Sequence, residues 1–226
     1  MLRHLTTVEQ RALVVAALRG ITVTLTKSVN GYHVIQHCVK FFSNEEKKQI
    51  LNVVANNCLD IATDRSGCCV LQHCVENADA QSRERLVAEI TANALVLSEH
   101  PYGNYVVQNI LGLRIPHYSS EIVRQLAGSL VHLSMNKYGS NVVEKLLKEC
   151  DEIDARVIIE EIVSSPNFLM VLQDPFGNYV VQSALAVSKG PLRYALVNII
   201  NMHYASLHSH PHGKRVLAKT RGKKLS

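Results

Sequence analysis

The sequence predicts an all-α solenoid built from repeats of about 36 residues, and three observations lead to this fold class. One short pattern, a glycine followed by apolar residues three, four, seven and eight places later, has the periodicity of a helix buried on one side. A longer helical pattern precedes it, with Ile50 and Val54 before the second copy. The pattern occurs six times with glycine spacings of 36, 36, 36, 38 and 36 residues, at Gly31, Gly67, Gly103, Gly139, Gly177 and Gly213. A fixed period of this size is typical of a solenoid in which each repeat packs on its neighbours.

Six repeats of about three helices each are expected to form one elongated domain over residues 1–226, curved by a small rotation between repeats. The two additional residues of the 38-residue interval fall in residues 163–168, where Ser-Ser-Pro ends a helix. Thr6 and Glu9 have the spacing of a capping box at the start of the first helix. The approximate bounds of the repeats are 7–42, 43–78, 79–114, 115–150, 151–188 and 189–222.

Four columns of the repeat, numbered from its glycine, are apolar and are predicted to face the shared core: positions −8, −6, +3 and +4. The +3 column is valine in every repeat. The glycine is predicted to allow a tight turn into the helix that follows, because it has no Cβ. The −8 column consists of Val23, Leu59, Leu95, Val131, Leu169 and Ala205.

The composition predicts a soluble, intracellular protein, because no apolar run is long enough to cross a membrane and no secretory signal is present. Its six cysteines contain no Cys-X-X-Cys pair, which agrees with that class. A net charge of +5 and a sequence pI near 8.9 fit an anionic partner without establishing one. Residues 191–226 contain no Asp or Glu, and the cations at the end of this stretch are either a solvated tail or phosphate contacts: Lys214, Arg215, Lys219, Arg221, Lys223 and Lys224.

The sequence gives little indication of an enzyme active site or of a metal-binding site. It contains no Gly-rich phosphate loop, no nucleophile with a base partner and no carboxylate pair in register, so we expect neither an enzyme nor a cofactor. The adjacent Cys68 and Cys69 have poor geometry for holding one zinc ion. The tract of His208, His210 and His212 is interpreted as a surface feature rather than a metal site.

Three further columns are not apolar, and we call their residues in each repeat a trio. Positions +1 and +5 are four residues apart on a helix, so they are expected to project side by side, with +2 beside them. Unconstrained exposed positions would vary among Lys, Glu, Ser, Asp and Arg, whereas +5 is an amide or a carboxylate in five repeats running. The +1 column is Tyr32, Cys68, Asn104, Ser140, Asn178 and Lys214; the +2 column is His33, Cys69, Tyr105, Asn141, Tyr179 and Arg215; and the +5 column is Gln36, Gln72, Gln108, Glu144, Gln182 and Ala218.

The repeats resemble those of the Pumilio (PUF) RNA-binding family, on Gly103-Asn-Tyr-Val-Val-Gln, Gly139-Ser-Asn-Val-Val-Glu and Gly177-Asn-Tyr-Val-Val-Gln, and the resemblance covers essentially the whole chain. It implies a curved, right-handed superhelix in which each repeat binds one unpaired base. Positions +1 and +5 would contact the base edge, and +2 would stack between bases. Tyr105 and Tyr179 are the best stacking residues, His33 and Asn141 are weaker, and Cys69 is poor.

The trios then predict a base sequence. A carboxylate accepts both N1–H and the N2 amine of guanine, so Glu144 indicates guanine, whereas a Gln amide pairs with uracil or adenine. By the family's rule, Asn with Gln fits uracil and Cys with Gln fits adenine. Because RNA runs antiparallel to protein in this family, the repeats predict 5′-UGUA followed by a tolerant position at Tyr32 and Gln36.

The last trio, Lys214, Arg215 and Ala218, resembles a terminal capping repeat, with possible phosphate contacts from its two cations. The first five repeats resemble the C-terminal five of an eight-repeat array. The resemblance implies a cytoplasmic monomer that binds single-stranded RNA in mRNA 3′ untranslated regions and controls translation or stability, with regulatory proteins on its outer face. Two alternatives stay open: a Pumilio-like ribosome-assembly factor with little base preference, and a protein-binding solenoid of the armadillo or HEAT kind.

Overall fold

The computed structural model describes residues 7–221 and contains eighteen helices in that range, three for each predicted repeat. In every repeat a long helix is followed by a short helix and then by a helix that begins within two residues of the glycine. The helices are α1 (Val8–Arg19), α2 (Thr22–Lys27), α3 (Tyr32–Phe41), α4 (Asn44–Asn56), α5 (Cys58–Ala62), α6 (Gly67–Asn77), α7 (Ala80–Ala92), α8 (Ala94–Ser98), α9 (Gly103–Gly112), α10 (Pro116–Leu126), α11 (Leu130–Met135), α12 (Gly139–Glu149), α13 (Glu152–Ser164), α14 (Phe168–Gln173), α15 (Gly177–Val187), α16 (Gly190–Met202), α17 (Tyr204–His208) and α18 (Pro211–Thr220).

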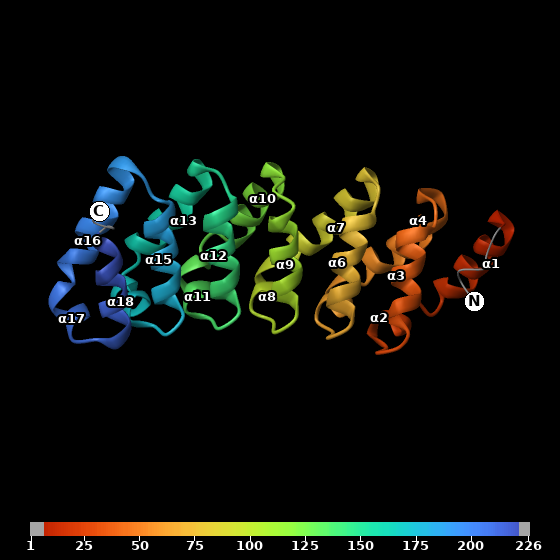
Figure 1. Cartoon of the computed structure of the whole chain (residues 1–226), viewed down its shortest axis with the longest axis horizontal. Coiled ribbons are helices and arrows are strands. Elements are labelled where there is room, and N and C mark those ends of the chain that lie inside the picture. Colours follow the sequence, from red (N-terminus) through yellow and green to blue (C-terminus); the bar gives the residue numbers. More distant parts are fainter. Residues whose placement is uncertain (1–6, 222–226) are drawn as a thin grey trace, which may run out of the picture. The chain divides into compact units, whose positions relative to one another are not determined.

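The chain divides into two compact halves, Met1–Ile110 and Leu111–Ser226, and each is described by itself. In the first half α3 packs on α6, and α4 packs on both α1 and α7. In the second half α12 packs on α15, which packs on α18. Equivalent helices of successive repeats therefore stand side by side within each half (Figure 1). The single continuous domain over 1–226 and its right-handed curvature stay predictions.

Polar side chains cap four of the six long helices, α1, α4, α7 and α13, and the first cap differs from the predicted one. The capping box of α1 is formed by Thr7 and Gln10, not by Thr6 and Glu9. Thr6 itself lies outside the described residues. Ser43 and Glu46 form the equivalent box of α4. The one-residue error arose because Thr6 and Thr7 are both followed three places later by a residue that fits the box.

The core columns are confirmed at three of the four predicted positions. Position +4 is buried in all six repeats, and positions −6 and +3 are buried in all but the first, where Leu25 and Val34 are half-buried. Position −8 was predicted wrongly: Leu59 and Leu95 are exposed, and no member of the column is buried. The buried column lies one residue earlier, at Thr22, Cys58, Ala94, Leu130 and Phe168. One residue corresponds to a rotation of about 100° around a helix, which is enough to exchange core for solvent.

The glycines are required by close packing rather than by a turn. Gly31 has helical backbone angles. A Cβ added at Gly177 would lie 2.6 Å from the carbonyl oxygen of Val171, and one at Gly213 would lie 2.7 Å from that of Leu207. The glycine therefore lets the third helix of each repeat touch the backbone of the short helix before it.

The loop insertion predicted for the fifth repeat is confirmed. α13 ends at Ser164 and α14 begins at Phe168, so three residues join the 13-residue long helix of the fifth repeat to its short helix. A single residue, Asn57 or Asn93, follows the 13-residue long helices of the second and third repeats, and the fourth repeat has a three-residue join after a shorter, 11-residue α10. No helix within residues 7–221 has the length and apolar character needed to cross a membrane.

Replacing Gly177 by Ala should destabilise the protein by about 1–3 kcal/mol, because the new methyl group overlaps the Val171 carbonyl and forces two helices apart. Gly112→Ala is the matched control, since a Cβ at that helical position meets nothing within 4 Å. It should stabilise α9 by up to about 1 kcal/mol through helix propensity. Urea unfolding followed by circular dichroism measures both, and equal effects would contradict the packing role of the glycine.

Candidate nucleic-acid interface

The trios lie on the first two turns of the six glycine-led helices, which we call the reading helices: α3, α6, α9, α12, α15 and α18. Because the +3 and +4 side chains of each reading helix are packed inward, the trio positions lie on its other sides. The three columns nevertheless differ in exposure. Position +2 is exposed in all six repeats, +5 is half-buried in the five repeats with an amide or carboxylate, and +1 is buried in four.

The +2 column provides open side chains, as predicted for stacking residues. Tyr105 is 56% exposed and Tyr179 is 45% exposed, so neither ring is a core residue. In the second half, the Arg215 guanidinium reaches back to the preceding repeat and donates a hydrogen bond to Tyr179 Oη at 2.9 Å. Its Cζ lies 5.9 Å from the Tyr179 ring centroid, within the range of a cation–π contact. The +2 side chains of the last two repeats therefore meet on one surface.

The +1 column departs from the prediction that it would be open beside +5. Asn104 is 1% exposed and Asn178 is 0% exposed. The Asn104 amide donates to the carbonyls of His100 and Pro101, at 2.8 and 3.0 Å. Asn178 makes the same pair of bonds to the turn before its own helix. Cys68 and Ser140 are also buried, so this column lies beneath the surface in four repeats.

The buried asparagines orient the amides above them. Gln108 Nε2 donates to Asn104 Oδ1 at 2.9 Å, and Gln182 Nε2 donates to Asn178 Oδ1 at 3.1 Å. Each bond uses one proton of the Gln amide and leaves the other proton and the Oε1 acceptor for a ligand. The predicted pairing of +1 with +5 is therefore present in the third and fifth repeats, where the buried +1 asparagine accepts a hydrogen bond from the +5 glutamine. Direct contact between these asparagines and a base stays a prediction.

The second repeat holds its amide by a different contact. Gln72 Nε2 donates to the Cys68 backbone carbonyl at 3.1 Å, and the buried Cys68 thiol donates to the carbonyl of Arg65. Cys68 Sγ lies 3.9 Å from Sγ of the exposed Cys69. A small thiol replaces the asparagine amide here, so no side-chain acceptor at +1 fixes the direction of Gln72.

The fourth repeat presents a carboxylate. Glu144 Oε2 accepts a hydrogen bond from Ser183 Oγ at 2.9 Å. The same oxygen forms an ion pair with Lys148 Nζ at 3.5 Å. Ser183 lies on α15, in the next repeat, and was not predicted from the sequence. The contact spans 39 residues, so only its place in the repeat, one residue after +5, could have indicated it.

The first and last repeats differ from the middle four. In the first, the Tyr32 and His33 rings lie 3.9 Å apart between centroids, and the backbone carbonyl of Gln36 contacts His73 Nε2. In the last, Lys214, Arg215 and Ala218 are exposed and offer no amide or carboxylate. Two of the C-terminal cations, Lys223 and Lys224, lie outside the described residues.

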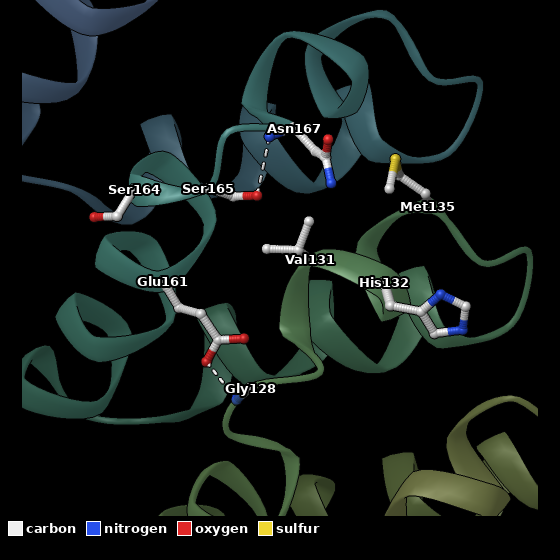
Figure 2. A pocket seen from close by; sticks show the side chains of 8 residues that line it. All are labelled: Gly128, Val131, His132, Met135, Glu161, Ser164, Ser165 and Asn167. Carbon is white, nitrogen blue, oxygen red and sulfur yellow. Dashed lines mark hydrogen bonds between the residues drawn. The ribbon is translucent and has the colours of Figure 1, made fainter.

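A hollow in the second half lies between α11 and α13–α14, and no trio residue lines it (Figure 2). Its most prominent polar group, the Glu161 carboxylate, accepts from the backbone N–H groups of Gly128 and Leu130, both at 2.9 Å, and so caps the start of α11. Ser165 Oγ accepts from the backbone N–H of Asn167. These groups already serve the fold, so the hollow does not compete with the trios as a candidate site. Among residues 7–221 no cluster of three or more potential metal ligands is found.

Comparison with known proteins agrees with this geometry. The family model for the Pumilio-family RNA binding repeat matches residues 22–55, 57–91, 93–125, 129–163 and 167–200. Each match begins at or near a short helix and contains one reading helix, so its frame is shifted by one helix from the bounds predicted from the sequence. The five matches contain the five trios with Gln or Glu at +5, and the Lys214 trio falls outside them.

Similar proteins are found among plant relatives. Pumilio homolog 12 of Arabidopsis thaliana is 41% identical over 216 residues, which are 96% of this chain and 36% of that protein. The chloroplastic pumilio homolog 7 of the same plant is 44% identical over 216 residues, 96% of this chain and 33% of that protein. The chain thus spans about a third of the length of these relatives.

Solved structures show the same arrangement of helices. The Puf4 RNA binding domain bound to the HO endonuclease RNA 3′ UTR recognition sequence has a TM-score of 0.85 and 35% identity, over 95% of this chain and 69% of that one. PUF-8 in complex with PBE-RNA has a TM-score of 0.83 and 25% identity, over 94% of this chain and 64% of that one. The predicted solenoid of three-helix repeats is therefore confirmed.

Cys69 should be the first cysteine to react with iodoacetamide in the folded protein. The thiolate is the nucleophile, and burial raises the pKa of Cys68, Cys58, Cys74 and Cys150 to about 12 and that of Cys38 to about 11. At pH 8 a thiol with a pKa of 12 is ionised in only about one molecule in 10⁴. Those five groups should therefore stay protected until the pH approaches 11–12 or the fold opens. Peptide mass spectrometry measures the order of labelling, Cys69→Ser is the control, and faster labelling of Cys68 would contradict the burial of the +1 column.

Proposed function

The chain belongs to the Pumilio family of RNA-binding repeat proteins, and from this premise we propose that it binds single-stranded RNA containing 5′-UGUA. The observation that carries the proposal is the order of hydrogen-bonding groups at +5 along the reading helices of the second half. The acceptor-only carboxylate of Glu144 on α12 is followed on α15 by the donor–acceptor amide of Gln182. Gln182 is held in a defined orientation by Asn178. A family of RNA-binding repeats is not an enzymatic one, in agreement with the sequence.

Each base follows from the hydrogen-bonding groups left open. Guanine offers two adjacent donors, N1–H and the N2 amine, and the two oxygens of Glu144 accept both. Uracil offers a donor flanked by acceptors, which suits the free Nε2 proton and Oε1 of Gln108 and of Gln182. Gln72, with the small Cys68 beneath it, is assigned adenine. No base is assigned to the repeat with Tyr32 and Gln36.

Stacking supplies the remaining contacts. Tyr105 and Tyr179 are exposed, and the stacking of one base on an aromatic ring is worth about 1–3 kcal/mol. Arg215, next to Tyr179, adds a cation for a phosphate or base at the 5′ end of the element. Lys214 is exposed in the same repeat and is assigned a phosphate contact. His33, Cys69 and Asn141 complete the stacking column with weaker contacts.

The biological role proposed for the chain is post-transcriptional control of messenger RNA. The solved Puf4 domain, 35% identical, is bound to a 3′ UTR recognition sequence, and binding of 3′ untranslated regions by this chain is proposed on that basis. Regulatory proteins on the outer face, a monomeric state and cytoplasmic residence stay predictions. The name of pumilio homolog 7 places that relative in the chloroplast.

The sequence leaves two other functions open. The family match gives no support to the protein-binding solenoid of the armadillo or HEAT kind. A Pumilio-like ribosome-assembly factor would hold RNA through charge with little base preference. The oriented amides of Gln108 and Gln182 favour base recognition over this alternative, because charge-based binding does not require them.

Binding of a short RNA with 5′-UGUA should exceed binding of the same RNA with 5′-UAUA by about 1–3 kcal/mol, since adenine lacks the two adjacent donors that Glu144 accepts. Fluorescence anisotropy at several salt concentrations measures both affinities, and both should fall as salt rises. Equal affinities that weaken with salt would favour the assembly-factor alternative. Absence of binding to either RNA would contradict RNA recognition by this chain.

The double variant Ser140→Asn with Glu144→Gln should change the preferred second base from guanine to uracil, because it recreates the Asn–Gln pair found in the third and fifth repeats. Selection from an RNA pool randomised at that base measures the change. The control is the base bound at Asn104 and Gln108, whose preference should not move. A retained preference for guanine would contradict the assignment of bases to repeats.

A further inference from the structure

We propose that Ser183 is a positioning residue for guanine, which holds the Glu144 carboxylate in the orientation that accepts the base. The inference rests on the proposed function and adds a residue that lies outside every trio. Ser183 Oγ donates to Glu144 Oε2 at 2.9 Å, from α15 of one repeat to α12 of the repeat before it. Ser183 is 8% exposed, so it acts through Glu144 rather than by touching RNA.

The hydroxyl of Ser183 departs from the usual behaviour of serine in a helix. Serine commonly donates to the carbonyl four residues earlier in its own helix. Ser98, Ser134, Ser188 and Ser209 all do so in this chain, to Ala94, Leu130, Ala184 and Ala205. Ser183 donates instead to a carboxylate on a neighbouring helix. A hydrogen bond to an ionised acceptor is stronger than one to a carbonyl, which accounts for the choice.

His73 and Asn109 occupy the same position as Ser183, six residues after the glycine of their repeat. Both contact the preceding repeat, but neither reaches a trio side chain there. His73 Nε2 contacts the backbone carbonyl of Gln36, and Asn109 Nδ2 donates to Glu76. Of these three residues, Ser183 is the one that donates to a +5 side chain, that of Glu144. The difference coincides with the one repeat that presents a carboxylate at +5.

The contact with Ser183 orients the Glu144 carboxylate, which no residue of its own trio holds. The Gln108 and Gln182 amides are oriented by an asparagine four residues earlier in the same helix, whereas Ser140 donates to the carbonyl of Lys137 and does not hold Glu144. Without a partner, the carboxylate would rotate about its terminal bond. Ser183 donates to Oε2 at 2.9 Å, and Lys148 approaches the same oxygen more distantly, at 3.5 Å. Oε1 therefore stays open for one donor of guanine, and Oε2 accepts the second donor in place of the Lys148 ammonium.

The test is Ser183→Ala, assayed for binding to RNAs with 5′-UGUA, 5′-UAUA and 5′-UGAA. The ratio of Kd values for UAUA and UGUA should fall roughly 2- to 10-fold relative to the parent chain, as loss of one hydrogen bond of ordinary net strength predicts. The ratio for UGAA and UGUA, which reports on Asn104 and Gln108, should stay unchanged. Ser183→Thr keeps the hydroxyl and should restore the guanine preference.

Ser188→Ala is the matched control, because it removes another buried hydroxyl at the end of the same helix without touching a trio. It should leave all three Kd ratios at the parent values. An unchanged UAUA to UGUA ratio in Ser183→Ala would overturn the inference while leaving the proposed function intact. A parent chain that does not prefer UGUA would overturn the proposed function itself, and the role of Ser183 with it.

Discussion

The structure depends on one close contact, repeated six times, between a reading helix and the backbone of the short helix before it. Glycine is required there because any Cβ would collide with a carbonyl or side chain six residues earlier, as Gly177 shows against Val171. The contact fixes the two helices as one rigid element. It also brings the turn between them against position +1, where Asn104 and Asn178 satisfy its carbonyls. The exposure of the trio is therefore set by the same packing that makes the repeat.

Coupling between repeats uses two kinds of interaction with different tasks. The apolar columns at −6, +3 and +4 bury the side chains that hold neighbouring repeats together. Polar contacts between repeats, such as Arg11 with Glu46 and Lys27 with Asp60, lie nearer the surface, where each ion pair contributes little stability. Their value is positional: Arg215 on Tyr179 and Ser183 on Glu144 set where the exposed groups of adjacent repeats lie relative to one another.

The sequence was sufficient for the features that recur with the period and insufficient for those that depend on helix rotation or on a neighbouring repeat. Spacing of the glycines predicted all the reading helices, and valine at +3 predicted their buried side. The short helices were too brief for periodicity to separate Leu59 from Cys58, so the exposed residue was placed in the core. Burial of Asn104 was not foreseen, because an asparagine is usually exposed and only the structure shows the carbonyls it satisfies. Ser183 could not be found from its own repeat, since its partner belongs to the one before.

These contacts bear on whether the repeats act as independent modules. The orienting partners of Gln108 and Gln182 come from the same helix, so a trio with Asn at +1 and Gln at +5 carries its own geometry wherever it is placed. The carboxylate trio does not, because Glu144 is held from the following repeat. Transplanting Ser140 and Glu144 alone would transfer the acceptor chemistry without the contact that directs it. The proposed recognition of guanine is therefore a property of two adjacent repeats, and the proposal makes its selectivity depend on Ser183, a buried residue outside every trio.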